Sequence, residues 1–199
     1  MIKPILFNTE MVRTIQDDRK TATRRVAKWC VQEVYDAACF HGKWHETYNP
    51  ANPPDTLVEW YLKNIKRPPY KPGDILYVRE TWHRDVARYM YKADYSENEK
   101  FYMGGKEIQI KWQPSIHMPK KAARLFLRVT GVWVERLQDI SDEDAEKEGC
   151  EDYTSTALGF PWVWDGTIPK KDLDRYGWNA NPWVWVYEFE RISKEEASK

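Results

Sequence analysis

The chain of 199 residues has few of the residues that build disulfide-bonded or zinc-binding domains. It holds three cysteines, which are widely spaced and include no CxxC pair. This number and spacing argue against a disulfide framework and a zinc ribbon, and favour reduced thiols. His41 and His45 lie close to Cys39, but a metal site normally needs more ligands than these. We therefore expect neither a metal nor an organic cofactor.

Long apolar segments and a net charge are also missing. The apolar run at the start is too short for a signal peptide and no longer one follows, so we expect a cytoplasmic protein without a membrane partner. Lys+Arg and Asp+Glu both number 31. A formal charge of zero argues against a protein that coats DNA non-specifically, although a locally basic cleft remains compatible with it.

Aromatic residues are abundant by contrast, with 11 Trp and 12 Tyr. Both side chains join a large apolar body to a polar tip, so they suit a core with polar edges and also surfaces on which bases stack. We expect most of them to lie in the core.

The order of apolar and polar residues predicts a mixed α+β protein. The expected elements are strand, helix, strand, strand, strand, helix and strand, at about 3–8, 9–18, 20–29, 75–82, 123–137, 138–149 and 181–192. This order suggests a single domain, 1–199, built as a small mixed β-barrel with two flanking helices. Long aromatic-rich insertions are expected at about 29–69, 83–119 and 150–181, the first with one helix in it.

Local signals support several of these boundaries. Thr9 is a plausible N-cap for the first helix, and Ser141 with Asp144 fits the capping pattern of the second. Gly149 fits the left-handed residue that follows a helix. Gly131 predicts a kink in the long strand.

The segment DDRKTATRR, residues 17–25, places cations around two threonines directly after the first helix. Taken alone, it could be a solvated basic turn. The segment is similar, however, to the motif of the ASCH family, a small β-barrel related to the PUA RNA-binding fold. Lys20, Thr23 and Arg25 match that motif, and Gly73 with Asp74 matches the family's next turn.

Further stretches extend the resemblance to about half of the chain. DISDEDAEKEG, 139–149, resembles the family's second helix, and WVWVYEFERI, 183–192, its closing strand. The sequence of residues 114–141 resembles that of phage and prophage ASCH proteins. This resemblance implies that the protein acts in the cytoplasm of a bacterium or of a phage-infected host. Asp18 stands where the family usually has glycine, so the tight turn there must be made another way.

The resemblance also implies a catalytic trio. Thr23 replaces the Glu of the common motif, a change shared with bacterial amidohydrolases of this family that deacylate N(4)-acetylcytidine. Their Lys, Thr and helix-borne Glu match Lys20, Thr23 and Glu148. Glu148 by itself would be read as part of a solvated acidic helix face.

These residue types suit acyl transfer. A threonine hydroxyl attacks a carbonyl only when a base takes its proton, and a lysine can be that base if its pKa falls. Neighbouring cations and burial lower a lysine pKa, whereas a close carboxylate raises it. In a regular strand Lys20 and Thr23 would face opposite sides, so the hypothesis requires the chain to bend or bulge between the end of the helix and the strand.

Six more residues are candidates for binding substrate or nucleic acid. The structural alternative is a solvated basic turn for the three that lie in residues 17–25. It is an ion pair at the rim for Arg79 and Glu80, and core packing for Trp82. The six are Arg19, Arg24, Arg25, Arg79, Glu80 and Trp82.

Three functions remain open at this point. The first is deacylation of a modified cytidine. The second is a binding module without turnover that recognises RNA or a modified base, with aromatic side chains stacking on bases. The third is an ASCH-type ribonuclease. The expected partner is a modified nucleoside or a single-stranded nucleic acid, RNA in preference to DNA, and the oligomeric state is left open.

Overall fold

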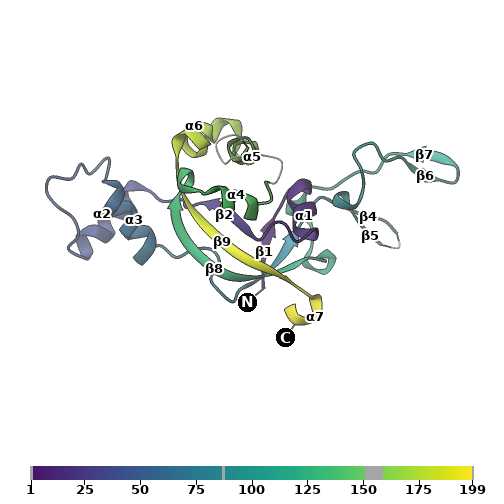
Figure 1. Ribbon diagram of the computed structural model, residues 1–199, viewed down its shortest axis with the longest axis horizontal. Helices are drawn as coiled ribbons and strands as arrows, with labels where there is room; N and C mark the ends of the chain where they lie inside the picture. Colours follow the sequence, from purple (N-terminus) through teal and green to yellow (C-terminus); the bar gives the residue numbers. More distant parts are fainter. Residues whose placement is uncertain (1, 87, 151–158, 199) are drawn as a thin grey trace.

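A five-stranded mixed sheet forms the centre of the molecule, seen here in a computed structural model that describes residues 2–86, 88–150 and 159–198 (Figure 1). Its strand order is β1-β3-β8-β9-β2, with β1 parallel to β3 and the other neighbours antiparallel. The strands are β1 (Ile2–Leu6), β2 (Ala22–Val26), β3 (Ile75–Arg79), β8 (Phe126–Arg136) and β9 (Trp183–Ile192).

The α+β class predicted from the sequence is confirmed, but the expected closed barrel is not formed. Strands β1 and β2 are the two edges of the sheet, and among the described residues their backbones do not pair. A side chain joins them instead, because Nη2 of Arg25 donates to the carbonyl of Leu6 over 2.7 Å. The sheet is therefore open at the backbone level and bridged by Arg25.

The long strand bends where the sequence predicted. The register between β8 and β9 shifts between Val129 and Gly131, which is a β-bulge. A Cβ at Gly131 would lie 3.0 Å from a carboxylate oxygen of Glu188, so glycine also gives that side chain room.

More helices than the predicted two surround the sheet. The described α-helices are α1 (Thr9–Gln16), α2 (Val31–Phe40), α3 (Asp55–Asn64), α4 (Asp142–Lys147), α5 (Phe160–Thr167), α6 (Leu173–Tyr176) and α7 (Lys194–Ala197). None of these helices has the length and apolar character needed to cross a bilayer.

The helix caps agree with the sequence patterns apart from one residue. The side chain of Asn8, rather than Thr9, caps α1 by accepting from the amide of Met11 over 2.8 Å. Ser141 caps α4 by accepting from the amide of Asp144 over 3.1 Å. Gly149 follows α4 with a φ of +90°, as expected for the left-handed position.

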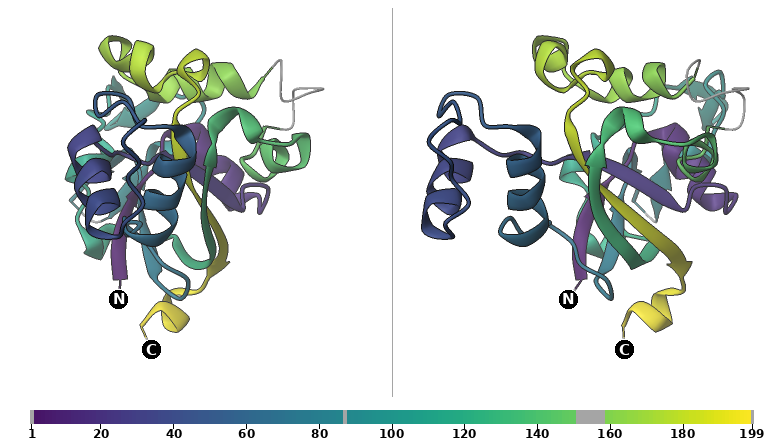
Figure 2. Two further views of the ribbon diagram at one scale, coloured as in Figure 1. Left: turned by 90° about the vertical axis from the view of Figure 1, so that its left-hand side faces the viewer. Right: turned by 60° about the vertical axis from the view of Figure 1, so that its left-hand side comes forward.

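Two of the expected insertions fold into defined elements that extend from the sheet in different directions (Figures 1 and 2). Residues 31–40 form α2, which the sequence did not predict, and α3 lies beside it. Two hairpins form the second insertion, from β4 (Trp82–Arg84), β5 (Tyr89–Tyr91), β6 (Phe101–Met103) and β7 (Lys106–Ile108). The third, at about 150–181, supplies α5 and α6, and its residues 151–158 lie outside the described part.

Alternate residues of β9 enter two different cores. Trp185, Tyr187 and Phe189 belong to the main core, together with buried residues of α1, α3, β1 and β3. Val184 and Val186 belong to a second core with residues of α4 and α5. Strand β2 therefore lies at an edge where two helix-covered faces meet, and this edge carries most of the predicted site.

Candidate functional site

A left-handed turn connects α1 to β2 and brings Lys20 inward. Asp18 has a φ of +59°, the conformation that glycine adopts most easily, and Nη2 of Arg191 pairs with its carboxylate over 2.7 Å. The amides of Arg19 and Lys20 then both donate to the carbonyl of Thr14, over 2.9 and 3.0 Å. The bend that the hypothesis required between the helix and the strand is thus present. The expectation that this turn must be made another way is wrong, because Asp18 itself adopts the left-handed conformation.

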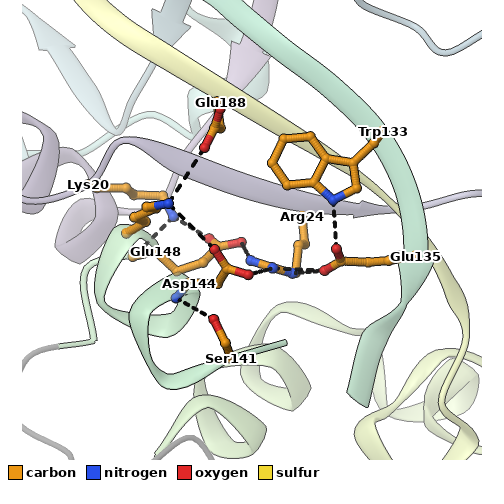
Figure 3. Close-up of polar contacts among 9 residues, drawn as sticks. Lys20, Arg24, Trp133, Glu135, Ser141, Asp144, Glu148 and Glu188 are labelled. Atoms are coloured by element: carbon orange, nitrogen blue, oxygen red, sulfur yellow. Dashed lines mark hydrogen bonds and ion pairs between the residues drawn. The ribbon is translucent and has the colours of Figure 1, made fainter. Parts of the chain in front are cut away.

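Lys20 and Glu148 form a buried ion pair. Their exposed fractions are 2% and 8%, and Nζ of Lys20 lies 2.5 Å from Oε2 of Glu148 and 2.9 Å from its backbone carbonyl. The end of α4 is fixed against β2, because the amide of Thr21 donates to the carbonyl of Lys147 over 2.8 Å. Glu148 is therefore not a solvated helix residue but a fixed partner of Lys20 (Figure 3).

Arg24 lies in the second core and is surrounded by carboxylates (Figure 3). Its Nη2 is 2.8 Å from Oε1 of Glu135 and 3.3 Å from Oδ2 of Asp144, and its Nη1 is 3.4 Å from Oε1 of Glu148. Trp133 donates to the other oxygen of Glu135 over 2.6 Å. Glu148 thus connects Lys20 to Arg24, and Arg24 holds α4 against the sheet instead of standing free for a ligand.

Thr23 faces the main core, next to Tyr187. The two residues are opposite each other in the β2–β9 ladder, so their side chains project from the same face of the sheet. Thr23 is 1% exposed and Tyr187 is 0% exposed. The Tyr187 hydroxyl has no partner with ordinary hydrogen-bond geometry among the described residues.

Lys20 and Thr23 both lie near Arg25, on the inner side of β2. It shares the face of Thr23, since residues two apart in a strand project to one side. Its guanidinium lies 5.1 Å from the ring centre of Phe7, and Nζ of Lys20 lies 5.8 Å from the same ring. Phe7 is therefore a common neighbour of both cations, and it belongs to the main core, the side of the sheet to which Thr23 projects.

Burial changes the acidity of two groups in the site. Loss of water lowers the pKa of Lys20, while the nearby Glu148 carboxylate acts in the opposite direction and Arg25 lowers it further. Burial also raises the pKa of the Tyr187 hydroxyl well above its usual range. Tyr187 thus stays a protonated donor, and the amine of Lys20 reaches its neutral form more readily than an exposed lysine would.

A small pocket opens between β2, α4 and α5. Thr23, Arg24, Arg25 and Glu148 line it from one side, and α5 closes the other. Its volume is about 20 Å³, which is room for roughly one water molecule. The three members of the predicted trio thus come together, two of them in the pocket wall and Lys20 bonded to Glu148.

The outer edge of β2 adds backbone groups to this pocket. The carbonyl of Thr21 accepts from Phe189 and the amide of Ala27 donates to Trp183, so odd-numbered residues of this segment bond to β9. In an antiparallel pair the intervening residues point the other way, so the amide and carbonyl of Arg24 point away from β9. Among the described residues this amide has no hydrogen-bond partner outside the ladder.

The other predicted binding residues lie elsewhere. Arg19 pairs with Asp17 near the surface, over 3.1 Å. Arg79 donates to the carbonyl of Met118, and Glu80 forms a two-pronged ion pair with Arg124 at 2.9 Å for both contacts.

Trp82 is 6% exposed and packs in a third core beside Met118. None of Arg19, Arg79, Glu80 and Trp82 is among the described residues lining the pocket of Thr23. For Trp82 the structural alternative describes the packing observed, whereas Glu80 forms its ion pair in a buried position, 1% exposed, and with Arg124.

The histidine pair near Cys39 has ordinary local contacts. His41 packs edge-on against Phe40 and Trp60, and Nδ1 of His45 lies 2.8 Å from the hydroxyl of Thr47. The described part of the chain contains no group of three or more side chains of the His, Cys, Asp or Glu type placed to bind a metal ion.

Sequence reasoning missed two features of the site, Tyr187 and the outward-pointing amide of Arg24. Tyr187 occurs in a strand rich in aromatic residues, WVWVYEF, and differs from Phe189, the next residue on its face, only by its hydroxyl. A lone hydroxyl in a core-facing row of aromatic residues is the signal that could have identified it. The outward amide depends on the pairing register, for which the sequence holds no comparable signal.

Comparison with known proteins gives a distant structural likeness. No protein-family model matches the chain, and no curated protein matches it. The chain is similar in fold to an ASCH domain. That structure, from Lactobacillus crispatus JV V101, is 11% identical with a TM-score of 0.46, covering 96% of this chain and 80% of that one.

Two further structures match the chain with lower TM-scores. A protein from Enterococcus faecalis V583 is 11% identical with a TM-score of 0.41, and the match covers 100% of this chain and 80% of that one. A hypothetical protein is 15% identical with a TM-score of 0.38, and the match covers 96% of this chain and 100% of that one.

Proposed function

We propose that this protein is an amidohydrolase that removes an acyl group from the exocyclic amine of an N(4)-acylated cytosine nucleoside. One observation carries the proposal, namely the buried pair of Lys20 and Glu148 beside Thr23. Nζ of Lys20 and Oε2 of Glu148 are 2.5 Å apart, and Thr23 and Glu148 line the same pocket. A base, its carboxylate partner and a hydroxyl nucleophile are the groups that acyl transfer by threonine needs.

The first step would form an acyl-enzyme. Lys20 in its neutral form takes the proton of the Thr23 hydroxyl as Oγ1 attacks the acyl carbon. Neutral lysine arises when the ammonium loses a proton to solvent, and burial favours this form because it lowers the pKa of Lys20. The carbon–nitrogen bond then breaks, and a proton from Lys20 or Glu148 goes to the departing exocyclic amine.

The second step would release the acid. Water attacks the threonine ester with Lys20 again as the base, the ester bond breaks, and the proton returns to the Thr23 oxygen. In both steps negative charge develops on the former carbonyl oxygen. For its stabilisation we propose two donors, the outward amide of Arg24, a pocket-lining residue, and the hydroxyl of Tyr187, which lies opposite Thr23 in the β2–β9 ladder.

Substrate entry requires α5 to move away from β2. The pocket of about 20 Å³ is far below the several hundred Å³ that ligands of nucleoside size occupy. Helix α5 has eight residues, and its N-cap, Gly159, makes no side-chain capping bond. A short helix without this cap depends mainly on tertiary contacts, here the burial of Phe160 and Trp164, so these are the contacts that its displacement would break.

Incubation with N(4)-acetylcytidine tests the proposal. We expect release of cytidine and acetate, measured by chromatography over a pH range from mild acid to mild base. N(4)-benzoylcytidine extends the same assay to a larger acyl group. Absence of cytidine release from every acylated nucleoside at every pH would contradict the proposal.

A binding module without turnover is a second candidate, and the contacts of Lys20 favour it. A lysine that donates to both a carboxylate and a backbone carbonyl is held as an ammonium ion, which is not a base. In that case the site would recognise a modified base and leave it unchanged. Saturable, salt-sensitive binding of acylated cytidine or short RNA with no product formed would favour this candidate.

A further inference from the structure

A second and much larger pocket lies farther along β2, at the other end of the strand from Lys20. Its volume is about 410 Å³, within the range that drug-sized and nucleotide-sized ligands occupy. Its wall combines the end of β2 and the residues after it with α6 and the start of β9. The residues used below are Trp29, Arg136, Arg175, Tyr176 and Trp183, and we call this cavity the Arg136–Arg175 pocket.

Two arginines give this pocket a positive wall. Arg175 is exposed, and its guanidinium lies 5.1 Å from the ring centre of Tyr176. No carboxylate pairs with Arg175 within the described ranges, and no residue lining the pocket there is acidic. Arg136 pairs with the exposed Asp55 and donates to the carbonyl of Asn181 over 2.7 Å, which fixes its position and leaves other N–H groups unused.

Aromatic residues form much of the rest of the wall. Trp29, Tyr176 and Trp183 all line the cavity, and the guanidinium of Arg136 lies 4.7 Å from the ring centre of Trp183. Trp183 is 7% exposed, and its Nε1–H has no hydrogen-bond partner among the residues described. That nitrogen is closed to solvent, so Trp183 offers the pocket the face of its ring and not its N–H.

We propose that the Arg136–Arg175 pocket binds a nucleotide. Arginine holds phosphate through paired N–H donors, and aromatic rings hold a base by stacking, so this wall matches a ligand that carries both groups. The shared chemistry is a phosphate next to a base, and the experiment below distinguishes a free nucleotide from one unit of a single-stranded RNA. The pocket is distinct from the site of Thr23, and its occupancy does not require that Lys20, Thr23 and Glu148 turn over a substrate.

Calorimetric titration tests this assignment. The full-length protein is titrated with cytidine 5′-monophosphate, cytidine, inorganic phosphate and a short single-stranded RNA. The variants are Arg175→Ala and Trp29→Ala, with Arg84→Ala as the control because Arg84 is an exposed arginine in the distant β4–β5 hairpin. Thr23→Ala is included to separate this pocket from the proposed deacylation site, and thermal melting confirms that each variant is folded.

We expect saturable binding of the monophosphate or the RNA, with cytidine and phosphate each binding more weakly. Arg175→Ala and Trp29→Ala should each weaken that binding about tenfold, while Arg84→Ala and Thr23→Ala leave it unchanged. Tighter binding of the monophosphate identifies a free nucleotide as the ligand, and tighter binding of the RNA identifies a polymer. No saturable binding of either, or equal affinity in wild type, Arg175→Ala and Trp29→Ala, would overturn the assignment.

Discussion

Nζ of Lys20 and Oε2 of Glu148 are 2.5 Å apart in a part of the protein where neither side chain exceeds 5% exposure. Lys20 precedes β2 and Glu148 ends α4, so this contact joins two segments that are distant in the sequence. Burying two charges is costly unless they meet each other and their other hydrogen-bonding groups are satisfied. A pair with this cost is expected at a functional site more than at a structural one.

Removing one partner of this pair should destabilise the protein more than removing both. Lys20→Met leaves the carboxylate of Glu148 buried with only the longer contact to Arg24, and should lower the free energy of unfolding by about 3 kcal/mol. Lys20→Met with Glu148→Gln removes the charge as well and should restore about half of that loss. Urea unfolding of the single and double variants gives the coupling energy, and strict additivity would mean that the pair contributes no interaction of its own.

The deacylation rate should rise with pH through the ionisation of Lys20. Burial lowers the pKa of this amine below its ordinary value of 10.5, although Glu148 opposes the change, and the neutral amine is the proposed base. kcat/KM should therefore increase toward a plateau as the pH approaches the lowered pKa from below. A rate that is flat or that falls over the same range would exclude neutral Lys20 as the base.

The free energy of unfolding should also depend on pH through the ionisation of Lys20. Since the pKa of Lys20 is lower in the folded state, the unfolded chain binds more protons between that pKa and 10.5. The free energy of unfolding contributed by Lys20 therefore rises with pH in this window, and is at its lowest below it. The difference between wild type and Lys20→Met, measured by urea unfolding at several pH values, isolates this contribution.

Tyr187→Phe should reduce catalysis without weakening the fold. The hydroxyl is buried and lacks an ordinary partner among the described residues, so its removal leaves stability unchanged or slightly higher. If the hydroxyl donates to the developing oxyanion, kcat/KM should fall about tenfold. Tyr70→Phe is the matched control, because the Tyr70 hydroxyl donates to the carbonyl of Pro4 over 2.7 Å.

The control should show the opposite result. Tyr70→Phe leaves the Pro4 carbonyl without this donor and should cost about 1 kcal/mol of stability with little change in kcat/KM. Full activity of Tyr187→Phe would remove Tyr187 from the proposed oxyanion site while leaving the roles of Lys20 and Thr23 untouched.

Gly149→Ala should disturb the placement of Glu148. Gly149 has a φ of +90°, and a Cβ there would lie 3.0 Å from both Cβ and Oγ1 of Thr14 in α1. We expect a loss of about 1–3 kcal/mol in unfolding free energy together with reduced activity. Gly166→Ala is the control, since a Cβ at Gly166 meets no atom within 4 Å, and it should be neutral or slightly stabilising in α5.

The parts of the fold that depend on local chemistry could be predicted from the sequence. Ser141 and Gly149 delimit the region of α4, and Gly131 marks the bulge of β8, because caps and bulges are set by a few neighbouring residues. The convergence of Lys20 with Glu148 was implied by the family resemblance, not by these local rules. The turn at Asp18 agrees with the bend that the chemistry required.

The rest depends on contacts between distant segments. Tyr187 lies beside Thr23 only because β9 pairs with β2 in one particular register, and a shift of one residue would turn its hydroxyl to the other face. Arg24 was expected to bind a ligand, yet carboxylates from β8 and α4 surround it. Helix α2 was not predicted either, and its buried residues, Val34 and Ala38, belong to the main core.

The central claim is that the Thr23 hydroxyl is the nucleophile, and cytidine release from N(4)-acetylcytidine by Thr23 variants tests it most directly. Thr23→Ala lacks the attacking oxygen, whereas Thr23→Ser keeps it. Both remove little from the fold, and thermal melting checks this. The account predicts that Thr23→Ala loses at least about a hundredfold in kcat while Thr23→Ser retains measurable turnover. Turnover by Thr23→Ala at the wild-type rate would contradict it.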